Sequence, residues 1–115
     1  MTEWQLAQQM ANIALGEKAI DVAILDVKDV TILADYFVIA SGRSTIQVKI
    51  IAEIIEDILL EQGLRPLRRD GFNEGRWVIL DYGAVILHIF RQQEREHYAL
   101  ESLWGDAKTV EIAAR

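Results

Sequence analysis

The chain has 115 residues, of which 51% are hydrophobic and none is cysteine, and its formal net charge is −6 at pH 7. This length suits one domain with a single core, and the apolar content argues against intrinsic disorder. The lack of cysteine excludes disulfides, thiolate chemistry and cysteine-based zinc sites. No apolar run reaches the roughly 20 residues of a membrane-spanning helix, and no signal or transit peptide is recognisable, so we expect a cytoplasmic protein.

The charge is distributed unevenly along the chain. Residues 1–64 hold ten acidic and four basic side chains, whereas residues 65–115 hold eight of each. The net charge argues against binding DNA or RNA by bulk electrostatics, because phosphate binding needs clustered lysine and arginine. It suits a basic protein partner, whose opposite field would speed encounter. Simple solubility of a cytosolic domain explains the same charge equally well.

The N-terminal segment predicts a helix followed by two strands. Thr2-Glu3-Trp4-Gln5 has the spacing of a capping box, and apolar residues continue at helical spacing to Gly16. Residues 21–27 are rich in β-formers and predict a first strand, and residues 36–40 predict a second.

A long helix is expected after the second strand. Ser44 is the predicted N-cap, with Gln47 as its capping-box partner, and Gly63 lies where a left-handed C-cap belongs. An apolar stripe at helical spacing is expected to face the core. The stripe consists of Val48, Ile51, Ile55 and Ile58.

Residues 77–90 predict a β-hairpin with a turn at Tyr82-Gly83, because glycine supplies the positive φ of tight hairpins. Pairing outward from that turn sets Leu80 against Val85 and Trp77 against His88. One face then carries Val78, Leu80, Val85 and Leu87, and the other carries Trp77, Ile79, Ile86 and His88. Both faces are too apolar for a sheet with one solvated side. The chain's own helices can cover one face and another protein the other.

The remaining segments complete the predicted fold. Residues 64–69 predict a strand at an edge or strand start, because Pro66 cannot donate a ladder hydrogen bond. Residues 92–103 predict a final helix, and the last dozen residues a loosely held tail. The order of elements predicts a single α/β domain, residues 1–107, with a mixed β-sheet and flanking helices. Residues 108–115 form the predicted C-terminal tail.

Two features of the sequence could belong to a catalytic or metal site. Ser41-Gly42-Arg43-Ser44 lies between a strand and a helix, where backbone N–H groups attract phosphate, but it lacks both glycine-rich phosphate-loop spacings. A nucleotidyltransferase would also need paired carboxylates to hold Mg²⁺, and the nearest acids lie on the polar face of the long helix. His88 and His97 are not spaced as metal ligands, and His88 is expected to pack against Trp77. A tight strand-to-helix turn is therefore the favoured interpretation of this segment.

The last third of the chain is rich in aromatic residues. Tryptophan and tyrosine are enriched in the energetic centres of protein interfaces, because each buries a large area at small entropic cost. Filling the core of a small domain is an equally good explanation for the group. These residues are Trp77, Tyr82, Tyr98 and Trp104, accompanied by Leu100 and Leu103.

The chain resembles the ribosomal silencing factor family RsfS, also called the Iojap family, over about residues 3–107. The matching segments occur in the family's order and spacing, and together they are highly specific. They are Ala34-Asp35-Tyr36-Phe37-Val38-Ile39-Ala40-Ser41-Gly42, Gln47-Val48, Trp77-Val78-Ile79-Leu80-Asp81-Tyr82-Gly83, His88-Ile89-Phe90, Arg95, Tyr98, Leu100-Glu101 and Leu103-Trp104. The chain departs from the family at Ala84, where members often have an acid, and at His97, where an aromatic is common.

The resemblance implies a fold related to nucleotidyltransferases but without their catalytic acids, and no cofactor. It implies binding to the large ribosomal subunit through its ribosomal protein fourteen of the L series. Such binding would block association with the small subunit and repress translation under nutrient limitation. Isolated members of the family form homodimers. A large-subunit assembly factor using the same surface is an open alternative, and a nucleotidyl-transferring enzyme is the less favoured one.

Candidate contact residues for the ribosomal protein follow from the aromatic group and the matched motifs. They are Trp77, Asp81, Tyr82, Arg95, Tyr98, Leu100, Leu103 and Trp104.

Overall fold

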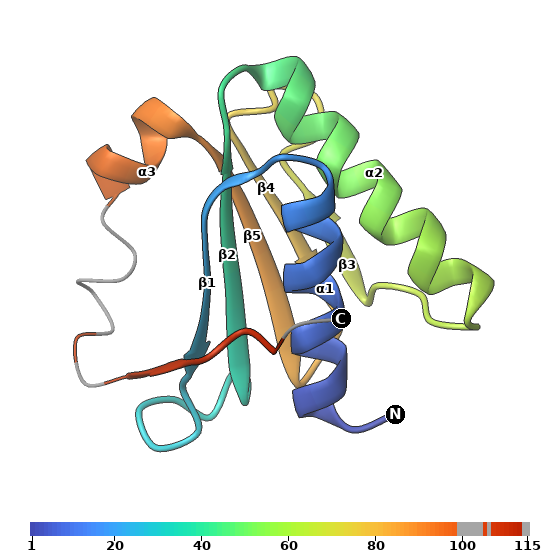
Figure 1. Cartoon of the computed structure of the whole chain (residues 1–115), viewed down its shortest axis with the longest axis vertical. Coiled ribbons are helices and arrows are strands. Elements are labelled where there is room, and N and C mark those ends of the chain that lie inside the picture. Colours follow the sequence, from blue (N-terminus) through green and yellow to red (C-terminus); the bar gives the residue numbers. More distant parts are fainter. Residues whose placement is uncertain (99–104, 106, 114–115) are drawn as a thin grey trace.

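The computed structural model describes residues 1–98, 105 and 107–113. Within them the chain forms a six-stranded sheet with the strand order β3-β4-β5-β2-β1-β6. The strands are β1 (Ile20–Asp26), β2 (Tyr36–Gly42), β3 (Arg68–Asp70), β4 (Trp77–Asp81), β5 (Val85–Arg91) and β6 (Lys108–Val110). The helices are α1 (Glu3–Gly16), α2 (Thr45–Glu61) and α3 (Gln92–Tyr98). Figure 1 shows α1 and α2 together on one side of the sheet and α3 apart from them on the other.

The sheet is mixed, which confirms the predicted α/β class. The central strands β2 and β5 are parallel, and every other neighbouring pair is antiparallel. All seven positions of β2 are buried, as expected for a strand that is covered on both faces. Among the described residues, no helix has the length and apolar character required to cross a membrane.

The helix ends follow local sequence signals. The N–H of Gln5 donates to Thr2 Oγ1 at 3.1 Å and the N–H of Thr2 donates to Gln5 Oε1 at 2.9 Å, so the predicted capping box is present. In α2 the Ser44 side chain accepts from the N–H of Gln47 at 3.1 Å, as predicted. The Gln47 side chain instead accepts from the N–H of Arg43 at 2.6 Å, so this second box is only half formed.

The C-terminus of α2 and its inward stripe also match the sequence pattern. Gly63 has a φ of +82°, and the N–H of Leu64 donates to the carbonyl of Leu59 at 2.9 Å, which is a glycine-based C-cap. Three stripe residues are fully buried, and the fourth is partly buried against the same core. The buried residues are Val48, Ile51 and Ile55, and the partly buried one is Ile58.

The hairpin of β4 and β5 differs from the predicted register by two residues. Leu80 pairs with Leu87 and Trp77 with Phe90, in place of the expected Val85 and His88. The turn lies at Gly83-Ala84, one residue later than predicted, and the N–H of Tyr82 donates to the carbonyl of Val85 at 3.0 Å. Gly83, with a φ of +87°, occupies the first loop position, where a two-residue hairpin turn with one positive φ requires glycine.

The strand predicted over residues 64–69 is shorter and later in the structure. β3 spans Arg68–Asp70 and forms one edge of the sheet, so the expected edge position is confirmed and the boundaries were wrong. Pro66 has no N–H to donate, and Leu67 is the first residue to pair, its N–H donating to the carbonyl of Asp81 at 2.6 Å.

The prediction of a loose C-terminal tail was wrong for its described part. Residues 108–110 form β6, which pairs antiparallel with β1 at the opposite edge of the sheet. The buried amide of Gln8 on α1 then holds the chain beyond β6, donating to the carbonyl of Glu111 at 2.8 Å and accepting from the N–H of Ala113 at 2.7 Å. Asn12 donates to the carbonyl of Ala113 at 3.1 Å. These side-chain contacts join segments more than 100 residues apart, so they cannot be predicted from a local sequence pattern.

The Gln8 contact predicts a measurable contribution to stability. Gln8→Ala removes two hydrogen bonds to the C-terminal segment and is expected to lower the free energy of unfolding by about 1–2 kcal/mol. Amide hydrogen exchange over residues 108–113 should accelerate in the same variant. Gln9→Ala, which alters the neighbouring glutamine of α1, is the control in urea unfolding. Equal stability and unchanged exchange in Gln8→Ala would show that the segment is held without the Gln8 amide, by strand pairing and the Asn12 contact.

Candidate protein-binding face

The sheet presents two apolar faces, as the hairpin pattern predicts. The first face packs against α1 and α2, and its hairpin residues Val78, Leu80, Val85 and Leu87 are fully buried. A separate cluster occupies the opposite face, which we call the second face. Its buried members are Leu25, Val27, Ala34, Phe37, Ile39 and Phe90, and partly buried Val30, Trp77, Ile86 and Ala107 pack against them.

Aromatic rings and one histidine form the centre of the second face. The Trp77 ring stacks on Phe90 with 4.9 Å between centroids, and Phe37 meets His88 edge-on at 5.0 Å. The indole Nε1–H of Trp77 donates to Nδ1 of His88 at 3.1 Å. The expected packing of His88 against Trp77 is therefore confirmed. The contact is diagonal across the hairpin, because His88 pairs directly with Ile79.

His88 is held as a neutral ring. Its side chain is only 7% exposed, and burial lowers its pKa to about 4. Because Nδ1 accepts from Trp77, the single proton of the neutral ring must lie on Nε2. Nε2 is buried and has no hydrogen-bond partner in the described part of the chain. The sequence places His88 and Trp77 on one face and predicts their packing, but it does not predict the hydrogen bond between the two rings.

Trp77 and Arg95 lie at the same end of the sheet. Trp77 begins β4 opposite Phe90, and Phe90 pairs with Ser41 on β2. Arg95, on α3, donates to the Ser41 hydroxyl at 3.0 Å and to the carbonyl of Asp21. Since α3 begins directly after β5, it starts beside Trp77.

Asp81 and Tyr82 lie at the other end of the hairpin. Asp81 accepts from the N–H of Gly83 at 2.8 Å and so stabilises the turn. Tyr82 packs against the core under the helices, on the face opposite Trp77, and burial raises its pKa to about 12. The structure therefore separates these two predicted contact residues from Trp77 and Arg95. The side chain of Tyr98, and Leu100, Leu103 and Trp104 entirely, lie outside the described residues.

The strand-to-helix segment before α2 is a tight turn, as the favoured interpretation holds. A Cβ at Gly42 would lie 2.9 Å from the Val48 Cγ2 atom, so glycine permits the close approach. The N–H groups of Arg43, Gln47 and Val48 are already bonded within the turn and the first helical residues. Among the described residues, no group of three or more His, Asp or Glu side chains is arranged to hold a metal ion.

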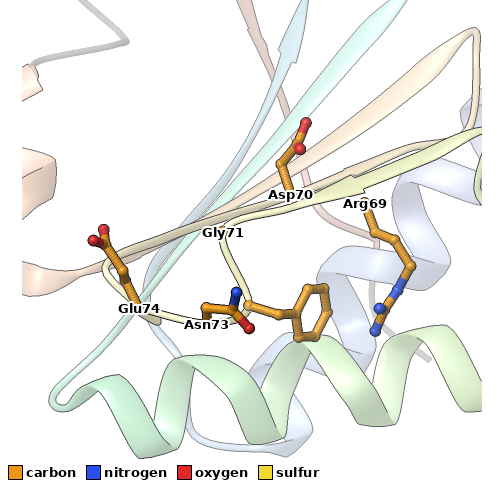
Figure 2. Close-up of a pocket in the computed structure, with 6 residues that line it drawn as sticks. Arg69, Asp70, Gly71, Asn73 and Glu74 are labelled. Atoms are coloured by element: carbon orange, nitrogen blue, oxygen red, sulfur yellow. The ribbon is translucent and has the colours of Figure 1, made fainter.

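A polar hollow of about 530 Å³ lies in the loop between β3 and β4, lined by Arg69, Asp70, Gly71, Phe72, Asn73 and Glu74. Figure 2 shows the carboxylates of Asp70 and Glu74 pointing apart. Arg69 forms an ion pair with Glu56 at 2.9 Å and lies over the Phe72 ring at 4.1 Å. Asp70 forms an ion pair with Arg68 at 3.1 Å, so Arg69 and Asp70 are engaged with different partners and do not form one charged cluster.

Comparison with known proteins gives matches along nearly the whole chain. The family model described as ribosomal silencing factor during starvation matches residues 1–115. The ribosomal silencing factor RsfS of Halalkalibacterium halodurans is 40% identical over 112 residues, which are 97% of this chain and 96% of that protein. A solved structure from Bacillus halodurans is 37% identical with a TM-score of 0.84, and the match covers 95% of this chain and 99% of that one.

A mouse relative carries a different name. The protein called mitochondrial assembly of ribosomal large subunit protein 1 is 29% identical over 112 residues, which are 91% of this chain and 49% of the mouse protein.

The burial of His88 predicts that stability falls in mild acid. The folded pKa of His88 is about 4, below the ordinary value of 6.5 expected for the unfolded chain. Between these values the unfolded state binds the proton more readily. The contribution of the neutral, buried His88 to the free energy of unfolding is therefore fully present above about pH 6.5. This contribution, up to about 3 kcal/mol, is lost as the pH falls through about 4.

Urea unfolding of the wild type and of His88→Phe between about pH 7 and pH 4.5 checks this expectation. Carboxylates titrate in both proteins, so the difference between the two pH profiles isolates the histidine. The wild type should lose more stability than the variant. Parallel profiles would mean that His88 gains its proton in the folded state as easily as in the unfolded one.

Proposed function

The chain belongs to the ribosomal silencing factor family RsfS, and we propose that it binds the large ribosomal subunit and blocks its association with the small subunit. The partner in this proposal is ribosomal protein fourteen of the L series, a basic protein. Translation is thereby repressed when nutrients are limiting. The protein acts in the cytoplasm by occupying a surface, with no catalytic step and no cofactor, and it forms a homodimer when isolated.

The second face is the observation that carries a binding role. Trp77, Ile79 and Ile86 are only partly buried there, beside the fully buried ring of Phe90. A partly exposed tryptophan held by a stacked ring and a hydrogen bond is already ordered, so burying it against a partner costs little further entropy. Large rigid aromatic residues of this kind supply most of the free energy in many protein interfaces.

The charge of the chain supports a basic partner. The formal net charge is −6, and exposed acids of α2, among them Glu53, Asp57 and Glu61, contribute to it. Opposite net charges raise the rate of encounter between proteins. Ribosomal protein fourteen, as a basic protein on the large subunit, has the complementary sign.

The contact surface is proposed to centre on Trp77 and α3. In this proposal Trp77 and Arg95, which lie at one end of the sheet, act together with Tyr98, Leu100, Leu103 and Trp104. Asp81 and Tyr82, at the far end of the hairpin, contact the partner only if the interface extends along the full strand. A β-strand rises about 3.3 Å per residue, so the four steps from the first to the last of the five residues of β4 separate the two ends by about 13 Å.

A role in large-subunit assembly is the second candidate. It is favoured by the name of the mouse relative, which refers to assembly of the mitochondrial large subunit. Both functions would use binding to the same subunit. They differ in timing, because an assembly factor acts on subunits that are still incomplete.

Sucrose-gradient sedimentation with purified subunits tests the proposed function. Adding the protein to mature large subunits before the small subunits should lower the joined ribosome peak, and the protein should sediment with the large subunit. Protein that binds mature large subunits without reducing joining would overturn the blocking mechanism. Binding restricted to immature subunits would favour the assembly role.

Substitutions at the two ends of the hairpin test the position of the interface. Trp77→Ala is expected to weaken large-subunit binding by about 30-fold or more, with some loss of melting temperature because the ring also packs on Phe90. Tyr82→Ala is expected to lower the melting temperature, because its ring packs under the helices, while binding of the folded protein stays near wild type.

Both variants should be compared by thermal melting and by binding below the melting transition. If Tyr82→Ala loses binding at constant stability, the interface includes the turn end of the hairpin. If Trp77→Ala loses only stability, the second face is core and the contact lies elsewhere.

A further inference from the structure

The ring of His88 has one satisfied nitrogen and one unsatisfied nitrogen. Nδ1 accepts the indole N–H of Trp77 at 3.1 Å. Nε2 is buried and makes no hydrogen bond with any part of the chain that the structure describes. Because Nδ1 must be unprotonated to accept, Nε2 carries the proton and is a donor without an acceptor.

An unsatisfied buried donor is costly, and nothing in the surroundings requires one. The ring lies among Phe37, Phe90 and Trp77, where the indole N–H of Trp77 needs the acceptor at Nδ1, but no contact among the described residues needs a donor at Nε2. Packing of the free protein therefore explains the ring but not its second nitrogen. A donor that is unused in the free protein gains its bond when an acceptor arrives from outside.

We propose that the Nε2–H of His88 donates a hydrogen bond to a main-chain carbonyl of the ribosomal partner. The inference rests on the proposed function and names the polar contact at the centre of its apolar face. A neutral carbonyl fits better than a carboxylate, because the neutral ring offers no charge to offset the cost of burying an anion among aromatic rings. The partner is a basic protein, and lysine and arginine side chains have no acceptor atom. This is a second reason to expect a main-chain carbonyl as the acceptor.

Binding in this manner requires a side-chain movement on the second face. Nε2 is covered in the free protein, so a neighbouring group must move before an acceptor reaches it. The hairpin residues of this face that retain exposure are Trp77, Ile79 and Ile86. Ile79 pairs directly with His88, Trp77 lies diagonally across the hairpin from it, and Ile86 lies two residues earlier on β5. The partner's apolar atoms would then cover the surface that these side chains uncover.

His88→Phe tests the contact, with His88→Gln as the conservative variant. Phenylalanine keeps an aromatic ring and removes both nitrogens, whereas glutamine keeps one acceptor and one donor. We expect His88→Phe to bind purified large subunits about tenfold more weakly than wild type. Its melting temperature should change little, because removing the unpaired Nε2–H offsets the loss of the acceptor for the Trp77 indole N–H. His88→Gln should recover part of the binding. Unchanged binding of a folded His88→Phe overturns the proposal.

A second measurement uses the unmodified protein and does not depend on any variant folding. In ¹⁵N-labelled protein, imidazole resonances report the tautomer and the state of the Nε2 proton. Addition of the isolated basic ribosomal protein should shift the Nε2 proton downfield and slow its exchange with water. A complex that forms without any change at Nε2 overturns this inference alone. A wild-type protein that binds neither the ribosomal protein nor the large subunit overturns the proposed function itself.

Discussion

The burial of β2 on both faces is the constraint from which the rest of the structure follows. All seven of its residues are buried, and it pairs in parallel with β5 at the centre of the sheet. A parallel pair needs a long crossover, which here contains α2, β3 and β4. The helices α1 and α2 cover one face of the sheet (Figure 1). The second face has no long helix over it, so its apolar strand residues pack against one another and against the aromatic rings of the hairpin.

The same residues consequently serve the fold and the proposed interface. Trp77 packs on Phe90 and donates to His88, so it stabilises the second face while part of its ring stays accessible. A side chain fixed by neighbours in this way is ordered before a partner arrives. Stability and binding are therefore coupled at this face, and a loss of binding is informative only beside a measurement of folding.

The features of the fold that depend on local sequence patterns could be predicted. The capping box at Thr2, the glycine cap at Gly63 and both apolar faces of the hairpin were predictable, because period and cap chemistry are local. The hairpin register was wrong by two residues, yet the faces were right, because an even shift preserves the alternation. β6 was missed because its three residues pair with β1, which lies far earlier in the chain. Of the candidate site, the Trp77–His88 contact was predictable, whereas the separation from Tyr82 required the observed packing.

The acidic residues of α2 and the proposed docking surface are separated in space, so we expect them to have different roles in association. The exposed acids Glu53 and Asp57 lie on α2, which covers the face opposite Trp77. Screening at physiological ionic strength extends over about 8 Å, so such charges act during approach more than in contact. In the proposed complex the apolar second face would act after encounter, by excluding water around its rings. Salt should therefore alter mainly the association rate, and truncation of a ring mainly the dissociation rate.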